Sequence, residues 1–250
     1  MAIVLKSKAE IEKMRRSGRL VRQVLDAVKE VVAPGVTTMD LERVAEAKIK
    51  ELGAKPAFKG LYEYPCVLCT SVNNEIVHGI PSERRMLKAG DIVSIDTGVL
   101  LDGYYGDSAI TVPVGGELSP ELQKLLDVTR DSLYRGIEAA RVGNTVGDVG
   151  AAVQQVVEAN GFSVVREFVG HGIGTKLHEE PQVPNYGTPG SGAKLREGMV
   201  LAIEPMVNMG RSESRVLADK WTAVTKDGKH SAHFEHTVAV TNDGPVILTE

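Results

Sequence analysis

The first part of the chain carries an apolar pattern with helical spacing. Apolar side chains recur every three or four residues, which is the period of one helix face; they are Ile11, Met14, Leu20, Val21, Val24, Leu25, Val28 and Val31. Ser7 and Glu10 form a capping box ahead of this run, and Pro34 follows its end. A second helix is predicted over residues 38–53, because Gly53 is typical of the position just beyond a helix end.

The rest of the chain mixes strand-like and helical patterns. Short apolar, β-branched runs predict strands, and these lie at residues 66–70, 75–79, 92–101, 163–169, 199–203, 221–225, 232–240 and 246–248. Two further helices are predicted over residues 120–140 and 146–160, the first with Pro120 in its opening turn. Two dipeptides predict hairpin turns, namely Asp102-Gly103 and Asp227-Gly228.

The first hairpin brings two acidic residues together. Asp102-Gly103 fits a two-residue turn, because both central positions need positive φ, and Gly98 then lies opposite Asp107. Side chains alternate faces along a strand, so Asp96 and Asp107 are diagonal neighbours on one face, with Cβ atoms roughly 7 Å apart. Two converging, half-buried carboxylates repel each other unless a positive charge lies between them. A metal ion would supply that charge, and two solvated carboxylates are the alternative.

The order helix, helix, strands occurs twice, and the two copies align at one constant separation. The interval from Gly35 to Gly143 is the same as the interval from Asp96 to Glu204. We predict an α+β fold with one domain over residues 1–250 and two pseudo-twofold-related halves, at about residues 7–115 and 116–250, with helices covering a mostly antiparallel, curved sheet. Carboxylates from both halves would then meet between the halves, a usual place for a pocket.

Three more residues extend the pair of aspartates. Glu204 follows the apolar run 199–203, Glu235 lies in the stretch 233–238, and His171 stands between glycines that leave its imidazole accessible. An edge charge, a surface residue and a loop histidine are the respective alternatives. An apolar strand rarely tolerates an uncompensated carboxylate, however, and this chain has two at equivalent positions.

Four carboxylates and one imidazole match the needs of two divalent ions about 3.5–4 Å apart. Such an oxygen-rich ligand set favours Mn, Fe(II) or Co over a thiolate-type zinc site. A water that bridges both ions would lose a proton near neutral pH and become a nucleophile.

Composition narrows the class of protein further. The 250 residues carry a net charge of −4 and no basic run, so no nucleic-acid site is predicted. The first apolar run is too short for a signal peptide, and no window of about 18 apolar residues exists, so a soluble protein that is not secreted is expected. Cys66 and Cys69 form one C-x-x-C; redox and half-zinc roles are the alternatives to ordinary strand cysteines in a reducing cytosol.

Several short segments carry a family resemblance. They are Asn73-Asn-Glu-Ile-Val-His78-Gly-Ile-Pro81, Ile95-Asp96-Thr-Gly, Asp102-Gly103-x-x-Gly106-Asp107, Gly170-His171-Gly-Ile-Gly174, His178-Glu-Glu-Pro181, Ile203-Glu204-Pro205 and Phe234-Glu235-His236-Thr237. From about Ser7 to Leu248 the chain resembles the type I methionine aminopeptidases, dinuclear metallopeptidases with a pita-bread fold. The resemblance implies a metal-dependent aminopeptidase that removes the initiator methionine from nascent proteins whose second residue is small.

The resemblance also implies a role for each metal-site residue. Asp96 would chelate one ion, Asp107 and Glu235 would bridge both ions, and His171 and Glu204 would complete the second ion. The free amine of the substrate would bind a metal, which explains why only the terminal residue is removed. The bridging hydroxide would attack the first peptide bond, and Glu204 would carry a proton from the metal-bound water to the leaving amine.

Two histidines and an apolar slot complete the implied site. His178 would stabilise the scissile carbonyl as it becomes an oxyanion, and His78 would bind the peptide beyond the cleaved bond. The methionine thioether suits polarizable surroundings, and its slot would be lined by Phe58, Tyr64, Cys69, Leu177 and Trp221. Core packing is the alternative role for Trp221, and Leu177 stands where the family frequently has an aromatic residue. A monovalent cation would bind loop carbonyls at Asn73, Glu75 and Ser231.

The resemblance implies a cytoplasmic monomer that acts on nascent polypeptide N-termini, with the ribosome near its exit tunnel as a further partner and no membrane contact.

Proline-directed aminopeptidases and dipeptidases use the same five ligands but usually carry a large domain before the catalytic one, whereas this sequence starts at the first helix. The type II enzymes insert a helical subdomain for which the residues between His171 and Glu204 are too few. Creatine-cleaving relatives, and pita-bread proteins that only bind, for example on ribosomes, should have lost metal ligands.

Overall fold

The structure, a computed structural model, describes residues 2–250. Its helices are α1 (Lys8–Val31), α2 (Thr38–Glu51), α3 (Pro120–Ala139) and α4 (Val146–Ala159), with a short 3-10 helix η1 (Leu61–Glu63). Its strands are β1 (Lys55–Pro56), β2 (Leu68–Val72), β3 (Glu75–Val77), β4 (Ile92–Leu101), β5 (Tyr104–Pro113), β6 (Ser163–Val164), β7 (Gly170–Gly172), β8 (Glu179–Val183), β9 (Val200–Ile203), β10 (Met206–Asn208), β11 (Ser214–Val216), β12 (Ala223–Thr225), β13 (Ser231–His233), β14 (His236–Thr241) and β15 (Gly244–Ile247). In the range described, no helix combines the length and the apolar character that crossing a bilayer requires.

The four predicted helices are confirmed to within about two residues at each end. Three of them begin with a complete capping box, at Ser7, Thr37 and Thr145, which satisfies backbone N–H groups that a helix start otherwise leaves unpaired. The fourth, α3, has Pro120 in its first turn and a side-chain cap from Ser119. Local sequence chemistry therefore fixes where the helices start.

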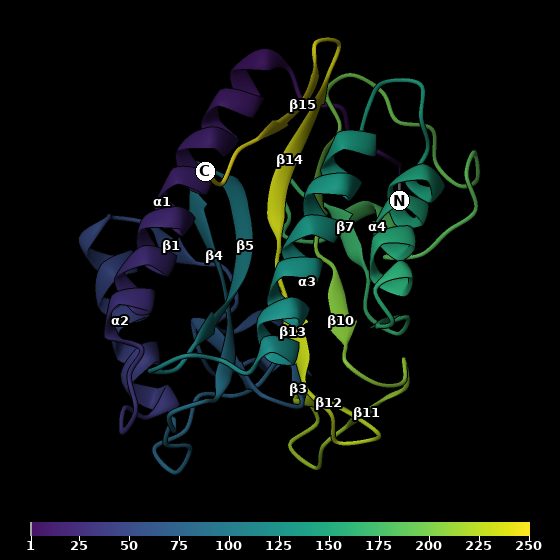
Figure 1. The fold of residues 1–250 in the computed structure, drawn as a ribbon. Coiled ribbons are helices and arrows are strands. Elements are labelled where there is room, and N and C mark those ends of the chain that lie inside the picture. Colours follow the sequence, from purple (N-terminus) through teal and green to yellow (C-terminus); the bar gives the residue numbers. More distant parts are fainter. Residues whose placement is uncertain (1) are drawn as a thin grey trace.

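The hairpin of β4 and β5 is the central unit of one half of the molecule. Asp102 and Gly103 have φ values of 49° and 83°, and Gly98 pairs with Asp107, so the predicted register is confirmed. Strands β2 and β1 pair with the other edge of β4. Helices α1 and α2 cover one face of this sheet (Figure 1), and their apolar side chains share a buried core with β2, β4 and β5.

The other half holds a five-stranded sheet in the order β15-β14-β9-β7-β8. Helices α3 and α4 pack against this half (Figure 1), and a second apolar core lies beneath them. Two short three-stranded sheets, β13-β10-β6 and β11-β12-β3, complete the strands. The observed mixture of helices and mostly antiparallel sheets confirms the predicted α+β class.

Backbone hydrogen bonds repeat at the predicted separation. Gly35 N–H donates to Leu87 O over 2.8 Å, and Gly143 N–H donates to Leu195 O over 3.1 Å, so donor and acceptor are both displaced by the interval that separates Asp96 from Glu204. Thr37 bridges Met86 in the same way that Thr145 bridges Lys194. The two copies therefore share local structure as well as residue types, and the division of the chain near residue 115 stays a prediction.

The two halves are joined between β5 and residues 233–237 by hydrogen bonds from side chains of one segment to the backbone of the other. Thr111 Oγ1 donates to His233 O over 2.7 Å, Ser108 Oγ donates to Glu235 O over 2.6 Å, and Thr237 Oγ1 donates to Asp107 O over 2.8 Å. Glu235 N–H also donates to Ala109 O over 2.9 Å. This seam fixes Asp107 and Glu235 relative to each other.

Each end of the chain crosses to the opposite half. Lys6 N–H donates to Gly198 O over 2.7 Å, and the carboxyl-terminal segment packs so closely on α1 that a Cβ at Gly18 would lie 2.1 Å from Leu248 O. Figure 1 shows the carboxyl terminus beside α1. The exchange ties the halves together at points distant from the seam.

Some strand predictions are wrong, and the reasons are physical. Residues 166–169 are not part of β6, and Phe168 and Val169 among them line a cavity. The predicted strand 232–240 is two strands, since the chain passes between sheets at Phe234 and Glu235. Asp227-Gly228 does not make a hairpin, because β12 and β13 belong to different sheets. The first strand of the central hairpin has the predicted bounds, the other predicted strands differ by one to three residues at an end, and β1, β7, β8, β10 and β11 were not predicted.

Candidate metal centre

One cavity of about 470 Å³ lies between the halves and is lined by side chains from both. It contains every residue that the sequence predicted for the metal, catalytic and methionine-binding sites: Phe58, Tyr64, Cys69, His78, Asp96, Asp107, His171, Leu177, His178, Glu204, Trp221 and Glu235. The fold thus brings together residues that lie far apart in the sequence, from Phe58 to Glu235. Which of them bind metal or substrate stays a prediction at this point.

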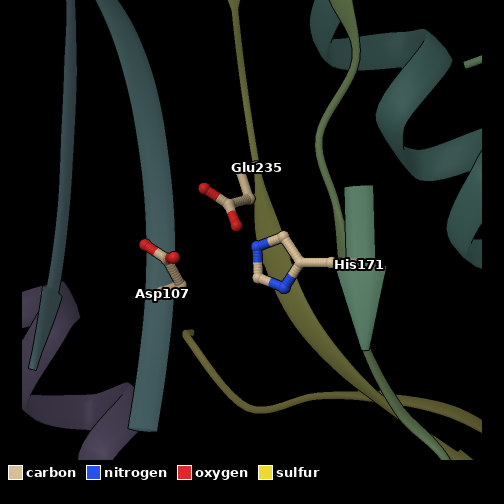
Figure 2. Close-up of side chains that lie close together, drawn as sticks. All are labelled: Asp107, His171 and Glu235. Atoms are coloured by element: carbon tan, nitrogen blue, oxygen red, sulfur yellow. The ribbon is translucent and has the colours of Figure 1, made fainter. Parts of the chain in front are cut away.

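Three of the predicted ligands converge from three separate strands or strand junctions. Asp107 lies on β5, His171 on β7, and Glu235 in the junction between β13 and β14. Each offers a ligand atom, and these atoms all lie within 4.8 Å of one another. Figure 2 shows the three side chains pointing toward a common centre. This spacing is within reach of ligand atoms that share one divalent ion at about 2.0–2.6 Å each.

Asp96 and Glu204 border this cluster. Asp96 pairs with Ala109 in the hairpin, so it is the diagonal neighbour of Asp107 on the same face, as predicted. Glu204 follows β9, and its Oε1 lies 3.6 Å from His171 Nε2. The five predicted ligands therefore surround one end of the cavity.

The carboxylates in this cluster are buried without the partners that a buried acid needs. Among the residues described, no hydrogen-bond partner reaches Asp96 Oδ1, Asp107 Oδ1 or Glu235 Oε1. Burial raises the pKa of Asp96 to about 7, and burial together with the charge of Asp96 raises the pKa of Asp107. Burial and the neighbouring carboxylates raise the pKa of Glu204 and Glu235 in the same way.

Divalent cations would coordinate these unpaired, buried carboxylate oxygens and offset the repulsion between them. The residues present therefore fit a metal site on the chemistry of the donors and on the orphaned oxygens. The imidazole agrees with this, because His171 Nδ1 lies 2.9 Å from Gly172 O. Donation to that carbonyl leaves the lone pair of Nε2 directed at the carboxylates, which is the usual arrangement of a histidine ligand.

The two other predicted histidines stand beside the cluster. The His178 ring meets the His171 ring edge-on at 4.5 Å between centroids, and the His78 ring meets Trp221 edge-on at 6.3 Å. Burial lowers the pKa of His78 to about 4 and also lowers the pKa of His178, so both rings are neutral near pH 7. His78 has a positive φ of 61°, an uncommon conformation that persists where the surroundings hold a side chain in place.

The predicted methionine slot is apolar and aromatic. Phe58, Tyr64, Cys69 and Leu177 are buried and belong to one apolar cluster, against which Trp221 packs. Tyr64 and Trp221 meet edge-on at 5.0 Å between ring centroids. Burial raises the pKa of the Cys69 thiol, so this cysteine is a small apolar wall element rather than a reactive thiolate.

The cavity is also lined by residues that were not predicted from the sequence. Tyr62 at its mouth is 72% exposed and stacks on the His178 ring at 6.3 Å. Phe168 packs edge-on against His78 at 5.5 Å. Tyr62 lies outside every predicted element, and Phe168 lies in the run predicted as a strand over residues 163–169, a pattern that does not mark it as a cavity residue.

The predicted monovalent-cation loop is compact, and its role stays a prediction. Asn73, in a left-handed conformation with φ 59°, accepts a hydrogen bond at its carbonyl from Ser231 N–H over 2.8 Å. Glu75 begins β3 close by and pairs with Val224. The two backbone segments predicted to share a cation are therefore neighbours.

Comparison with known proteins gives the same family. The family model described as metallopeptidase family M24 matches residues 12–242. A methionine aminopeptidase of Clostridium perfringens is 55% identical over 247 residues, which cover 99% of this chain and 98% of that protein. The crystal structure of methionine aminopeptidase from Thermotoga maritima superimposes with a TM-score of 0.97 at 48% identity and covers both chains completely.

A more distant structure defines the limits of the likeness. The prolidase from Pyrococcus horikoshii superimposes with a TM-score of 0.80 at 24% identity, covering 99% of this chain but 63% of that one. This match shows a shared fold and carries no argument about substrate. The family match, the full-length identity and the shared pita-bread architecture lead to one conclusion: the chain belongs to metallopeptidase family M24 and, within it, to the methionine aminopeptidases.

Proposed function

We propose that this protein is a metal-dependent aminopeptidase that removes the initiator methionine from nascent chains whose second residue is small. The observation that carries the proposal is the cavity in which unpartnered, buried carboxylates adjoin an apolar, aromatic slot. The relatives named methionine aminopeptidase support the same activity. The cytoplasm is the proposed location, and polypeptide N-termini are the proposed partners.

Five residues would hold two divalent ions, with Mn, Fe(II) and Co as the candidates. They are Asp96, Asp107, His171, Glu204 and Glu235, with Asp107 and Glu235 shared between the ions. When bound, such ions polarise a carbonyl and make water acidic enough to act as a nucleophile near pH 7.

The remaining residues bind and orient the substrate. A neutral His178 can donate a hydrogen bond to the carbonyl oxygen of the scissile bond, where negative charge develops. His78 lies beside Trp221 and Phe168, where it would contact the peptide beyond that bond. Glu204, whose pKa burial raises, would accept a proton and return it to the leaving amine.

The slot selects the side chain that is removed. Its buried walls exclude water and charged groups, and its aromatic and sulfur-containing side chains suit an unbranched thioether. Leu177 forms one wall and is 4% exposed. A monovalent cation at Asn73, Glu75 and Ser231, a monomeric state and contact with the ribosome are further proposals that follow from the resemblance.

Hydrolysis of Met-Ala-Ser, measured beside an Xaa-Pro peptide, tests the proposal. We expect the methionine peptide to be preferred, turnover to vanish in EDTA, and activity to return with Mn, Fe(II) or Co. Preference for the Xaa-Pro peptide would contradict the substrate assignment. Undiminished turnover in EDTA would contradict the metal site.

A further inference from the structure

His233 is a buried imidazole beside the metal centre that the proposed mechanism does not use. It ends β13, is 1% exposed, and its Nε2 lies 3.7 Å from Glu204 Oε2. The other oxygen of the same carboxylate, Oε1, lies 3.6 Å from His171 Nε2. The Glu204 carboxylate therefore sits between two imidazoles, of which only His171 belongs to the predicted ligand set.

The ring nitrogen of His233 that faces Glu204 has no other use. In the part of the chain that the structure describes, Nε2 is buried and without a hydrogen-bond partner. A neutral imidazole carries one N–H and one lone pair, and a lone pair facing a carboxylate would be repelled. The tautomer with the proton on Nε2 is therefore favoured, and Glu204 Oε2 is an acceptor 3.7 Å from this nitrogen.

The backbone of His233 is held by contacts on two sides. His233 pairs with Met206 between β13 and β10, two positions beyond Glu204. On the other side, His233 N–H donates to Thr111 Oγ1 over 2.9 Å, and Thr111 Oγ1 donates to His233 O over 2.7 Å. The backbone of His233 is thus fixed on both sides, and a hydrogen bond from Nε2 to Glu204 Oε2 requires the two atoms to come closer than the observed 3.7 Å.

Resting on the proposed function, we infer that His233 is a positioning residue for Glu204. Its Nε2–H donates to Glu204 Oε2 and turns Oε1 toward His171 and the metal-binding end of the cavity. The bond divides the two carboxylate oxygens between a protein donor and the bound ion. Residues that orient a metal ligand in this way typically contribute about 10- to 100-fold to metal affinity or activity.

Cobalt binding tests the inference without relying on turnover. Metal-free wild type, His233→Gln and His233→Phe would be titrated with Co²⁺ by calorimetry and by visible absorption, which reports the coordination of the ion. We expect His233→Phe to lose about 10- to 100-fold in affinity and to change the absorption bands. We expect His233→Gln, whose amide can still donate to Oε2, to recover most of the affinity and a near-native spectrum.

His236→Phe is the matched control, because it also alters a buried histidine next to Glu235. Its ring faces away, with Nδ1 2.8 Å from Thr249 Oγ1. This variant should leave Co²⁺ affinity and the absorption bands unchanged, and thermal unfolding of each metal-free variant would establish that it is folded. With Met-Ala-Ser, His233→Phe should lower kcat more than it changes KM.

The outcomes separate this inference from the proposed function. If wild type binds no Co²⁺, the proposed metalloenzyme fails and this inference with it. If wild type and His233→Phe bind Co²⁺ equally and with the same spectrum, only the role of His233 is overturned. If His233→Gln is as impaired as His233→Phe, donation to Glu204 is not what the imidazole supplies, and the inference is equally overturned.

Discussion

Glu42 and Glu235 are both buried glutamates, at 5% and 2% exposure, and they differ in what surrounds them. Glu42 accepts the backbone N–H groups of Val67 and Leu68 over 2.8 and 2.9 Å, so both of its oxygens are bonded. Glu235 has a buried oxygen with no hydrogen-bond partner in residues 2–250, and other carboxylates are its neighbours. The first acid is satisfied by the fold, and the second is not.

The same contrast separates two parts of the cavity wall. Glu179 pairs with Lys6 Nζ over 2.6 Å, with both side chains almost fully buried, whereas Asp96 and Asp107 carry orphaned oxygens a short way along the wall. Buried polar groups are nearly always paired in folded proteins. A cluster of exceptions in one place is therefore evidence for something the cluster binds, and an isolated, well-bonded acid is evidence for structure.

Among the substitutions that test this difference between unpartnered and hydrogen-bonded acids, Asp107→Asn should have the largest effect. The substitution removes one bridging ligand, and because bound metal supplies several kcal/mol to the transition state, turnover of Met-Ala-Ser should fall by about a thousandfold or more. The free energy of unfolding in EDTA should stay the same or rise, since a repelled, buried charge is lost. Peptide hydrolysis and chemical unfolding measure the two effects.

The control for Asp107→Asn lies on the same hairpin. Asp102→Asn changes the exposed turn, where asparagine also tolerates the observed φ of 49°, and turnover should be unchanged. A large loss of stability in metal-free Asp107→Asn would show that this carboxylate is satisfied by the fold after all, and the comparison with Glu42 would lose its basis.

Lys6→Met tests the paired acid of the cavity wall. Lys6 also donates to Val4 O over 3.1 Å, and removing it leaves Glu179 buried without its cation, so the free energy of unfolding should fall by about 3–5 kcal/mol. The double variant Lys6→Met with Glu179→Gln should recover part of that loss. Equal unfolding free energies for wild type and Lys6→Met would show that the pair contributes nothing to stability.

The hydrophobic pattern predicted the helices and the hairpin because those depend on neighbours in sequence. Capping at Ser7, Thr37 and Thr145 and the turn at Asp102-Gly103 are decided within a few positions of the chain. The repeat then placed Glu204 in the other half at the position equivalent to Asp96. The same local chemistry, applied twice, was enough to locate one end of the cavity.

The hydrophobic pattern does not predict contacts between segments that are far apart in the sequence. Nothing in the sequence around Lys6 indicates that it pairs with Glu179, which lies 173 positions away. The strand predicted over residues 232–240 carries His233 and Glu235 on one face by alternation, which is the signal that could have named His233. The break after β13 instead depends on the seam with β5, where Ser108 binds the carbonyl of Glu235.

Metal removal and return should separate the two kinds of acid by thermal unfolding. At a metal concentration one hundred times its dissociation constant, binding should stabilise wild type by about 2.7 kcal/mol relative to EDTA. Glu42→Gln should show the same increment, because Glu42 does not line the cavity, and Asp107→Asn should lose most of it. An equal increment in all three proteins would place the bound ion elsewhere.

Glu42→Gln should have the smallest effect, confined to stability. The amide leaves one of the N–H groups of Val67 and Leu68 without its acceptor, so the free energy of unfolding should fall by about 1–3 kcal/mol. Turnover per folded molecule should match wild type. A loss of activity without a loss of stability would connect Glu42 to the cavity and remove it as the reference acid.

The difference in unfolding free energy between wild type and Glu42→Gln should depend on pH, and this dependence reports the ionisation of Glu42. Burial raises its pKa, and the two backbone N–H groups offset this only in part. A raised folded-state pKa means that the stability due to Glu42 is fully present below the unfolded value of about 4.3 and is lost as pH rises through the folded value. Glutamine does not titrate, so the difference in unfolding free energy between wild type and Glu42→Gln should be largest near pH 4 and should narrow toward pH 7. If the difference in unfolding free energy instead widens with pH, the two backbone N–H groups lower the pKa of Glu42 more than burial raises it. Glu42 would then be held in its ionised form by the fold.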